Sequence, residues 1–266
     1  MANLRKSANL CIADWSLVAG ESVRTSTGLI LHARRSTREA VTLKLVADPD
    51  TFEAERAALE VFAGRGSVRL IAAASNHRAL LLERVEPGDP LSSLVAAGKD
   101  EAATLAGAEV ARRLQTAGGP GAAAGLPALD SEAAMALDRQ GPSQAGPRSP
   151  IAKSVVEGAR VELEDLCSSG QASAVLHGDL HHDNILRAAR EPWLAIDPKG
   201  RVGEPICEYA ALVRNPIEQL VEQPSARPQP ADRSAGRVCG LRSSSAHRLG
   251  KGAGCRRCLL GSRGQG

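Results

Sequence analysis

Short stretches with the pattern of β-strands predict a small antiparallel sheet in the first third of the chain. Apolar residues alternate with polar ones, or run together, over four stretches of strand length: residues 29–33, 40–46, 68–71 and 79–83. A polar turn, residues 34–39, separates the first two stretches as in a β-hairpin. Because Lys44 alternates with Leu43 and Leu45, its side chain points to the opposite face of the second strand from theirs.

Helical spacing of apolar residues begins soon after the second predicted strand. Residues 51–63 carry apolar side chains at positions i, i+3, i+4 and i+7, which is the stripe of a packed helix. Glu55 borders this stripe, whereas Glu53 neighbours the exposed side of the helix. We therefore expect Glu55 to pair with Lys44, with Glu53 as the second choice.

The middle of the chain predicts helices separated by loops. Residues 100–116 repeat apolar side chains at helical spacing and begin with two acidic residues, which favour a helix N-terminus. Two stretches rich in Gly, Ala, Pro or Ser predict loops, residues 118–124 and 141–150. Three later stretches predict a helix, a strand and a short helix, residues 151–167, 174–176 and 207–213.

Residues that can carry phosphoryl-transfer chemistry follow the strand predicted at 174–176. The sequence H-G-D-L-H-H-D-N, residues 177–184, places Asp179 and Asn184 on one tight loop, and a later apolar run ends in Asp197. In kinase-type centres a loop Asp accepts the proton of the attacking hydroxyl. An Asn and a second Asp hold Mg²⁺ against the nucleotide phosphates. The sequence therefore predicts that ATP and Mg²⁺ bind here.

The spacing between these residues agrees with that chemistry. Residues 185–186 and 194–196 are expected to pair as the two strands of a hairpin, so that Asn184 and Asp197 lie about one strand spacing, ~5 Å, apart. Mg²⁺ prefers hard oxygen ligands and keeps several waters. One carboxylate, one amide oxygen and the phosphates are therefore enough to hold it.

Two other interpretations of the 177–184 loop are a transition-metal site and a structural polar turn. Imidazole and carboxylate groups are ordinary zinc ligands, and the loop offers His177, Asp179, His181, His182 and Asp183. Neither interpretation accounts for Asn184, the strand after it and Asp197 together. We expect His177 to brace the loop rather than carry a proton, and His181, His182 and Asp183 have no assigned role.

The loop and the segment after it resemble a known family. H-G-D-L-H-H-D-N-I-L, followed by W-L-A-I-D-P-K-G-R-V-G-E-P, resembles the aminoglycoside phosphotransferases, and among them the streptomycin phosphotransferase and hydroxyurea kinase branch. The resemblance runs from about residue 15 to about residue 216. It implies an α+β, protein-kinase-like bilobal fold. A small antiparallel N-lobe sheet, residues 1–86, would then precede a mainly helical C-lobe, residues 87–222.

The resemblance also implies a role for each matched position. Asp179 is the catalytic base, Asn184 and Asp197 are the metal ligands, and Lys44, braced by Glu55, positions the α and β phosphates. The strand-to-loop exit around Glu83 and Val85 resembles the interlobe hinge, whose backbone binds adenine. Residues 21–28, with one glycine and several hydroxyls, stand where the nucleotide-covering loop is expected. Glu204 and Glu208 face an amino or guanidino group of the acceptor, or else are solvated surface carboxylates.

The function implied is ATP-dependent phosphorylation of a hydroxyl on a small molecule, with streptomycin as the expected acceptor. One alternative is a kinase of another small alcohol or of hydroxyurea. The other, from a different class, is an inactive protein that still binds a nucleotide but has an incomplete substrate lobe. Acceptor contacts are expected largely beyond the region of resemblance, so the sequence does not choose among these acceptors.

Charge and composition narrow the partners. The net charge is +3, yet residues 217–266 hold nine basic and three acidic residues, so the preceding part carries −3. A mildly acidic body favours a cationic acceptor and makes nucleic acid an unlikely partner. No apolar run approaches the ~18 residues of a membrane span, and no signal peptide is recognised. Six scattered cysteines fit a reduced compartment, so we expect a cytoplasmic protein; the sequence does not predict its oligomeric state.

The last stretch, residues 223–266, differs in character from the rest. It is basic, lacks aromatic residues and is rich in Arg, Gly, Ser and Pro, which predicts a disordered tail. A zinc site at Cys239, His247, Cys255 and Cys258 has unsuitable spacing. Reading residues 250–262 one nucleotide later permits an amphipathic helix, so we hypothesise a frameshift that replaced the family's last helices.

Overall fold

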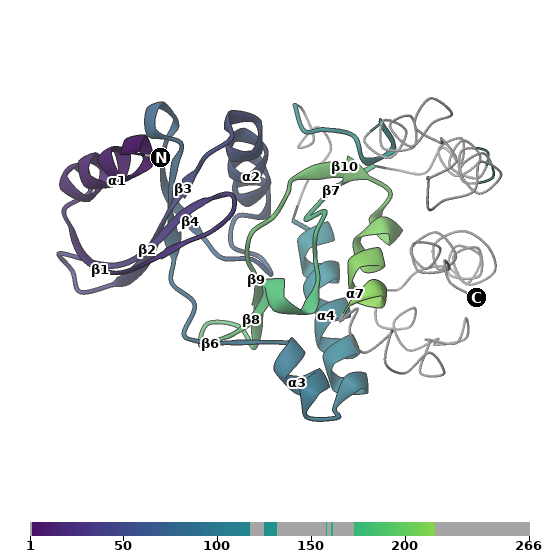
Figure 1. Cartoon of the computed structure of the whole chain (residues 1–266). Coiled ribbons are helices and arrows are strands. Elements are labelled where there is room, and N and C mark those ends of the chain that lie inside the picture. The colour runs from purple at the N-terminus through teal and green to yellow at the C-terminus, as the bar shows by residue number, and fades with distance from the viewer. Residues whose placement is uncertain (1, 118–124, 132–157, 159–160, 162–172, 216–266) are drawn as a thin grey trace, which may run out of the picture.

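The computed structural model describes residues 2–117, 125–131, 158, 161 and 173–215, and these residues form two lobes (Figure 1). The first lobe holds a five-stranded antiparallel sheet in the order β1-β2-β3-β5-β4. Its strands are β1 (Leu17–Arg24), β2 (Gly28–Arg35), β3 (Ala40–Val46), β4 (Leu70–Ala74) and β5 (Ala79–Glu83). The 3₁₀ turn η1 (Ser75–His77) joins β4 to β5.

One helix packs on each face of this sheet. Helix α1 (Ala2–Asp14) places Ala8 and Cys11 in a cluster with Leu43 and other inward residues of β3. Helix α2 (Pro49–Phe62) packs on the opposite face, where Phe52 and Leu59 join Val46, Leu80 and Leu82. Because Lys44 alternates with Leu43 and Leu45, it lies on the α2 face, as the strand pattern predicted.

The chain enters the second lobe after β5. This lobe contains β6 (Pro87–Pro90), α3 (Ser92–Ala96), α4 (Asp100–Gln115), β7 (Ala174–Leu176), η2 (His182–Asn184), β8 (Ile185–Ala188), β9 (Trp193–Ala195), β10 (Arg201–Gly203), η3 (Pro205–Tyr209) and α7 (Ala210–Arg214). Two small sheets, β6-β8-β9 and β10-β7, carry the loops of the site, and α4 supplies the buried residues Val110, Ala111 and Leu114 beneath them.

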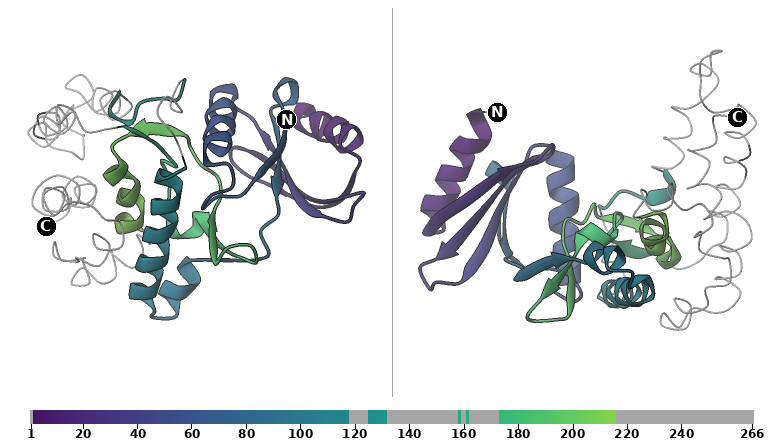
Figure 2. Two further views of the ribbon diagram at one scale, coloured as in Figure 1. Left: turned by 180° about the vertical axis from the view of Figure 1, so that it is seen from behind. Right: turned by 60° about the horizontal axis from the view of Figure 1, so that its bottom comes forward.

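Helix α2 belongs to the cores of both lobes, and it lies between them in both views of Figure 2. Phe52 and Leu59 pack on the N-lobe sheet, whereas Ala58 and Phe62 join the C-lobe core together with Leu114. The helix starts at a definite point because the Asp48 carboxylate accepts the backbone N–H of Thr51 at 2.8 Å. A residue on α2 can therefore reach groups from either lobe.

Most of the predicted elements are confirmed to within a few residues. Helix α4 agrees with the prediction for 100–116 and β7 coincides with 174–176, while α2 starts two residues before the predicted position. The predicted strand 68–71 is displaced to Leu70–Ala74, because the N–H of Val68 donates to the Ala195 carbonyl of β9 at 2.9 Å instead. The predicted helix 207–213 begins as the 3₁₀ turn η3.

In the N-lobe, the bounds of one expected loop are corrected and one helix is added. The nucleotide-covering segment expected at 21–28 is mostly strand, because β1 continues to Arg24 and β2 starts at Gly28; only Thr25–Thr27 form the turn. Helix α1 was not predicted at all. Several predictions fall outside the described residues, apart from residues 158 and 161. They are the helix at 151–167, the loops at 118–124 and 141–150, the tail from residue 223 and the frameshift hypothesis.

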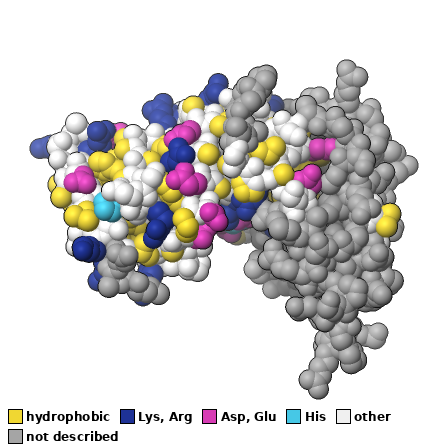
Figure 3. All heavy atoms as spheres, turned by 90° about the horizontal axis from the view of Figure 1, so that it is seen from above, with side chains coloured by type: hydrophobic (Ala, Val, Ile, Leu, Met, Phe, Trp, Pro, Cys, Tyr) yellow, Lys and Arg dark blue, Asp and Glu magenta, His cyan; other side chains and the backbone are white. Residues whose placement is uncertain are grey.

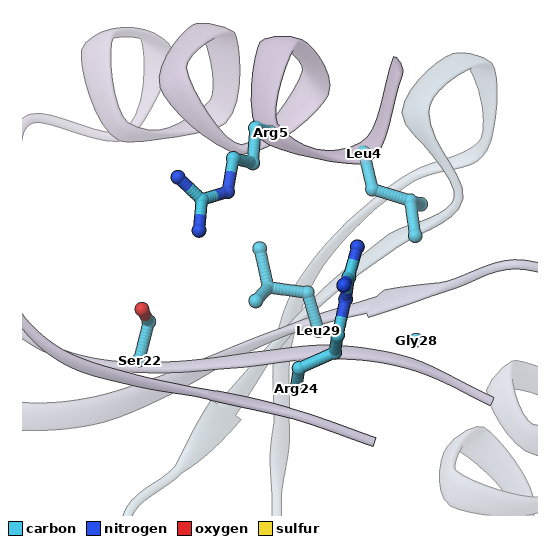
Figure 4. A pocket seen from close by; sticks show the side chains of 6 residues that line it. All are labelled: Leu4, Arg5, Ser22, Arg24, Gly28 and Leu29. Atoms are coloured by element: carbon cyan, nitrogen blue, oxygen red, sulfur yellow. The ribbon is translucent and has the colours of Figure 1, made fainter. Parts of the chain in front are cut away.

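Surface features of the described residues bear on possible partners. Basic and acidic side chains are intermixed on the face of the N-lobe shown in Figure 3. No helix in the described part of the chain is long and apolar enough to cross a membrane. A shallow pocket between α1 and the β1–β2 hairpin is lined by Arg5, Arg24 and Leu29 among others (Figure 4). Leu29 pairs with Leu45, so this pocket lies on the face of the sheet away from Lys44.

Candidate active site

An ion pair between β3 and α2 forms one wall of the candidate site. The Lys44 ammonium donates to both carboxylate oxygens of Glu55 at 2.7 Å and also contacts Asp197. Burial opposes the charge on Lys44, but the carboxylates of Glu55 and Asp197 outweigh it and hold the pKa of Lys44 above its ordinary value. The expected Lys44–Glu55 pair is confirmed, whereas Glu53 pairs with Arg56 at 2.8 Å on the outer side of the helix.

Asp197 follows β9 in a left-handed backbone conformation with φ of 61°. Asp is among the few residues that adopt this conformation readily. Burial raises the pKa of Asp197, but the charge and hydrogen bond of Lys44 outweigh it and hold the pKa below its usual value. The Asp197 carboxylate is therefore charged at neutral pH, and the Lys44 ammonium balances its charge in this structure.

Asn184 lies beside Asp197, as the predicted hairpin requires. Ile185 pairs with Ala195, and the N–H of Ile196 donates to the Asn184 carbonyl at 2.9 Å. The Asn184 side-chain amide donates to the backbone carbonyl of Asp179 at 2.9 Å. This hydrogen bond fixes the side chain and links the proposed base to the proposed metal ligand.

His177 joins the 177–184 loop to the segment that holds Asp197. It is fully buried; one ring nitrogen, Nε2, lies 2.8 Å from the Ile196 carbonyl, and the other accepts the N–H of Asp179 at 3.3 Å. Burial lowers the pKa of His177 to about 4. The ring is therefore neutral at neutral pH, with its proton on Nε2 because the carbonyl can only accept. These contacts brace the loop, as expected.

The expectation that Glu208 faces the acceptor is wrong. Its residue is 2 % exposed, and its carboxylate accepts the backbone N–H of His177 at 2.6 Å and that of Gly178 at 3.2 Å. Burial raises the pKa of Glu208 to about 7, against the effect of these two hydrogen bonds. Glu208 thus supports the 177–184 loop from beneath. Glu204, the other residue predicted to face the acceptor, is half-buried at the start of η3.

Lys199 is a site residue that the sequence analysis missed. Its ammonium lies 3.9 Å from the Asp179 carboxylate and 3.7 Å from the Asp197 carboxylate. Its place two residues after Asp197 is the one signal in the sequence that could have pointed to it.

The side chain of Glu83 has a structural partner at the hinge. Arg190, in the turn between β8 and β9, donates to both Glu83 oxygens at 3.0 Å and to the Ser67 carbonyl at 2.9 Å. The expectation for Glu83 and Val85 concerned their backbone groups, so this ion pair does not conflict with it. Val85 is partly buried and packs, like Ile196, against the cluster under the N-lobe sheet. Nothing in the sequence pattern pointed to Arg190.

The remaining polar residues of the loop have different surroundings. Asp183 accepts a hydrogen bond from the Ser92 hydroxyl at the start of α3, and its own N–H donates to His181 Nδ1 at 3.3 Å. His182 is buried, and among the described residues neither of its ring nitrogens has a hydrogen-bond partner. Within the described ranges, no three His, Cys, Asp or Glu side chains converge as a metal site.

The charge balance of the site suits a divalent cation. Three carboxylates, those of Glu55, Asp179 and Asp197, face two ammonium groups, those of Lys44 and Lys199. Asn184 precedes β8 and Asp197 follows β9, at neighbouring ends of the paired strands, and amide and carboxylate oxygens are the hard-oxygen donors that Mg²⁺ prefers. These two residues could therefore hold the ion, and both lysines could meet phosphate oxygens.

Comparison with known proteins places this geometry in a family. The model of the family described as aminoglycoside/hydroxyurea antibiotic resistance kinase matches residues 14–263. A hydroxyurea phosphotransferase of Kitasatospora aureofaciens is 35 % identical over 208 residues, 76 % of this chain and 58 % of that protein. A streptomycin 3''-kinase of Klebsiella pneumoniae is 33 % identical over 205 residues, 76 % of this chain and 71 % of that protein.

A solved structure gives the same fold. A choline/ethanolamine kinase family protein from Mesorhizobium loti superposes with a TM-score of 0.62 at 13 % identity, covering 98 % of this chain and 95 % of that one. The fold is thus the kinase-like α+β fold. Together with the match of the family model over most of the sequence, this shows that the chain belongs to the aminoglycoside/hydroxyurea antibiotic resistance kinases.

Proposed function

We propose that the protein transfers the γ-phosphate of ATP to a hydroxyl of a small antibiotic-type molecule, with streptomycin as the first candidate acceptor. The observation that carries this proposal is the approach of Asp179, Asp197, Lys44 and Lys199 from two lobes to one site. The relatives reported above are named for hydroxyurea and for streptomycin. Both compounds are therefore candidates, as is another small alcohol.

The proposed chemistry assigns one task to each side chain. The acceptor oxygen forms its bond to the γ-phosphorus as the bond from that phosphorus to the bridging oxygen of ADP breaks. Asp179 takes the acceptor's proton and ADP leaves. Lys44, held by Glu55, positions the α and β phosphates. A Mg²⁺ ion held by Asn184 and Asp197 would neutralise charge on the phosphates when bound. The backbone around Glu83 and Val85 would receive the adenine.

The direct test is ADP release from ATP with streptomycin, with hydroxyurea, with ethanolamine and with no acceptor. We expect streptomycin to stimulate release. Asp179→Asn should reduce stimulated release by ~10²-fold or more while Mg-ATP still binds, since a general base contributes a factor of that order. Asp183→Asn, in the same loop but with a side chain 65 % exposed, is the matched control. Release that no acceptor stimulates, or that Asp179→Asn does not change, contradicts the proposal.

Glu204 remains the residue proposed to meet a cationic group of the acceptor. Streptomycin carries guanidinium groups, whereas hydroxyurea is neutral. Glu204→Gln should therefore raise KM for streptomycin and leave KM for hydroxyurea unchanged. An equal effect on both acceptors would assign Glu204 to the support of η3 instead.

A nucleotide-binding protein without transfer activity is the second candidate. Every residue proposed to hold ATP and Mg²⁺ lies in the described part of the chain, whereas Glu204 is, besides the base Asp179, the one acceptor contact proposed there. Thermal stabilisation by Mg-ATP without ADP release in the presence of any acceptor would favour this second function.

A further inference from the structure

We propose that Lys199 is a further catalytic residue, whose ammonium binds the γ-phosphate during transfer to the acceptor. This inference rests on the proposed function and extends it to a residue outside the recognised loop. The observation behind it is the position of the Lys199 ammonium between two carboxylates with different tasks, 3.9 Å from Asp179 and 3.7 Å from Asp197. With the roles proposed for these two carboxylates, a cation at that position would lie between the acceptor hydroxyl and the nucleotide phosphates.

The backbone on both sides of the Lys199 side chain is fixed. The N–H groups of Lys199 and Gly200 both donate to the His177 carbonyl, at 2.8 and 3.2 Å. Gly200 packs so closely on α2 that an added Cβ would lie 2.3 Å from the Ala54 carbonyl oxygen. The backbone that carries the Lys199 side chain is thus held in place by the 177–184 loop and by α2, and a charge on a fixed backbone can stabilise a transition state at little cost of reorganisation.

The two ion pairs of Lys199 are loose, which leaves the ammonium able to take a new partner. Lys44 contacts Glu55 at hydrogen-bond distance, whereas both contacts of Lys199 exceed 3.5 Å. The Lys199 side chain is about one-third exposed. Phosphate oxygens entering between the carboxylates could therefore gain charge-assisted hydrogen bonds without breaking a tight ion pair.

The 177–184 loop itself supplies no permanent cation for the transferred group. Residues 180–183 are Leu, His, His and Asp, and His182 is buried with a pKa that burial lowers. Lys44 is committed to Glu55 and Asp197. Phosphoryl transfer spreads negative charge over the equatorial oxygens of the γ-phosphate, so a cation is needed there. Among the described residues, Lys199 is the basic side chain that contacts the Asp179 carboxylate.

The test compares binding of ATP with binding of ADP in the presence of Mg²⁺ and without acceptor, by titration calorimetry. Lys199→Met should weaken ATP binding ~10-fold or more and change ADP binding less than ~2-fold, because ADP lacks the γ-phosphate. Acceptor-stimulated ADP release should fall ~10²-fold, the usual effect of losing one group that stabilises transition-state charge. Lys199→Arg should recover part of the ATP preference. Lys99→Met, a lysine at the start of α4, should change none of these quantities.

Each other outcome overturns the inference. Equal weakening of ATP and ADP would mean that Lys199 only neutralises the two carboxylates, and unchanged ATP binding would remove it from the site. If the wild-type protein binds neither nucleotide, the proposed function fails as well. A melting temperature within a few degrees of wild type for Lys199→Met confirms that the variant is folded.

Discussion

Two buried residues beside the proposed base respond to pH in opposite directions. Glu208 accepts the backbone N–H groups of His177 and Gly178, and His177 in turn accepts the N–H of Asp179. Burial lowers the pKa of His177 to about 4 and raises that of Glu208 to about 7. The position of Asp179 thus depends on an imidazole that stays neutral and on a carboxyl that titrates near neutrality.

These shifts have opposite effects on stability. His177, whose pKa is lowered from 6.5, contributes stability that is full above pH 6.5 and lost as the pH falls through about 4. Glu208, whose pKa is raised from 4.5, contributes stability that is full below pH 4.5 and lost as the pH rises through about 7. Between pH 4.5 and 6.5 the two contributions largely cancel.

Single substitutions should separate the two contributions. His177→Gln should make the free energy of unfolding fall by about 2 kcal/mol between about pH 5 and about pH 7, and Glu208→Gln should make it rise by about as much, at 1.36 kcal/mol per pKa unit. Urea denaturation at the two pH values measures this. Parallel pH profiles for the wild type and both variants would show that neither group titrates as described.

The two proposed metal ligands differ in charge, and this predicts a difference in their substitutions. Asp197→Ala removes a carboxylate and should abolish the dependence of ATP binding on Mg²⁺. Asn184→Ala removes a neutral oxygen and should weaken it only partly. Titrating Mg²⁺ at a fixed ATP concentration measures the Mg²⁺ dependence of ATP binding for each variant. Equal, mild losses would argue that the β8–β9 hairpin does not hold the ion.

Among the elements, the segment after β9 is shaped by close backbone contacts. Gly200 has φ of 60°, and its missing side chain lets the segment approach α2. A side chain at this position would push the segment away from the helix and carry Lys199 with it. Gly200, the glycine of D-P-K-G, is thus required for Lys199 to lie where it does.

Gly200→Ala should lower both stability and activity more than the same change at Gly98. Gly98 has a similar φ of 72°, but nothing lies within 4 Å of an added Cβ there. The substitution at Gly98 therefore measures the strain of the left-handed backbone alone, about 1 kcal/mol. Melting temperatures of the two variants give the difference due to the clash. Equal losses would mean that α2 yields easily.

Sequence patterns predicted local elements better than contacts between them. The Lys44–Glu55 pair followed from one strand and one helix, because their periodicities fix which side chains share a face. The start of β4 did not follow, because the N–H of Val68 pairs with β9, more than a hundred residues later. Helix α1 was missed because its apolar side chains form a weak stripe that only the outer face of the sheet completes.

The candidate site was predicted where a motif lies in one stretch of sequence. Asp179, Asn184 and Asp197 lie within twenty residues and the structure brings them together. The role of Glu208 could not be predicted, because an acidic residue near a motif is equally compatible with facing solvent, acceptor or backbone. Only its burial under His177 decides between them.

At the scale of the whole molecule, Arg190 connects segments from both lobes. It binds Glu83 at the end of β5, the carbonyls of Gly64 and Ser67 before β4, and Glu191. Glu191 in turn contacts Arg113 of α4 at 2.7 Å. The hinge is therefore tied to the C-lobe by a network of charge-assisted hydrogen bonds.

Arg190→Met should destabilise the protein by about 2 kcal/mol, because it leaves the partly buried Glu83 without its bidentate partner. Arg35→Met, which breaks an exposed pair with Glu39, should cost less than about 0.5 kcal/mol. Chemical denaturation of the two variants provides the comparison. A similar small loss for both would show that the lobes do not depend on this connection.

Helix α2 carries Glu55 while packing into both lobes at once. Many protein kinases switch themselves off by swinging the corresponding helix outward, which separates the lysine from its glutamate. In this protein such a movement would remove Ala58 and Phe62 from the C-lobe core and break the contact between Gly200 and Ala54. In this structure the ion pair is therefore coupled to the packing of both lobes. We therefore expect the Lys44–Glu55 pair to form without a separate activation step.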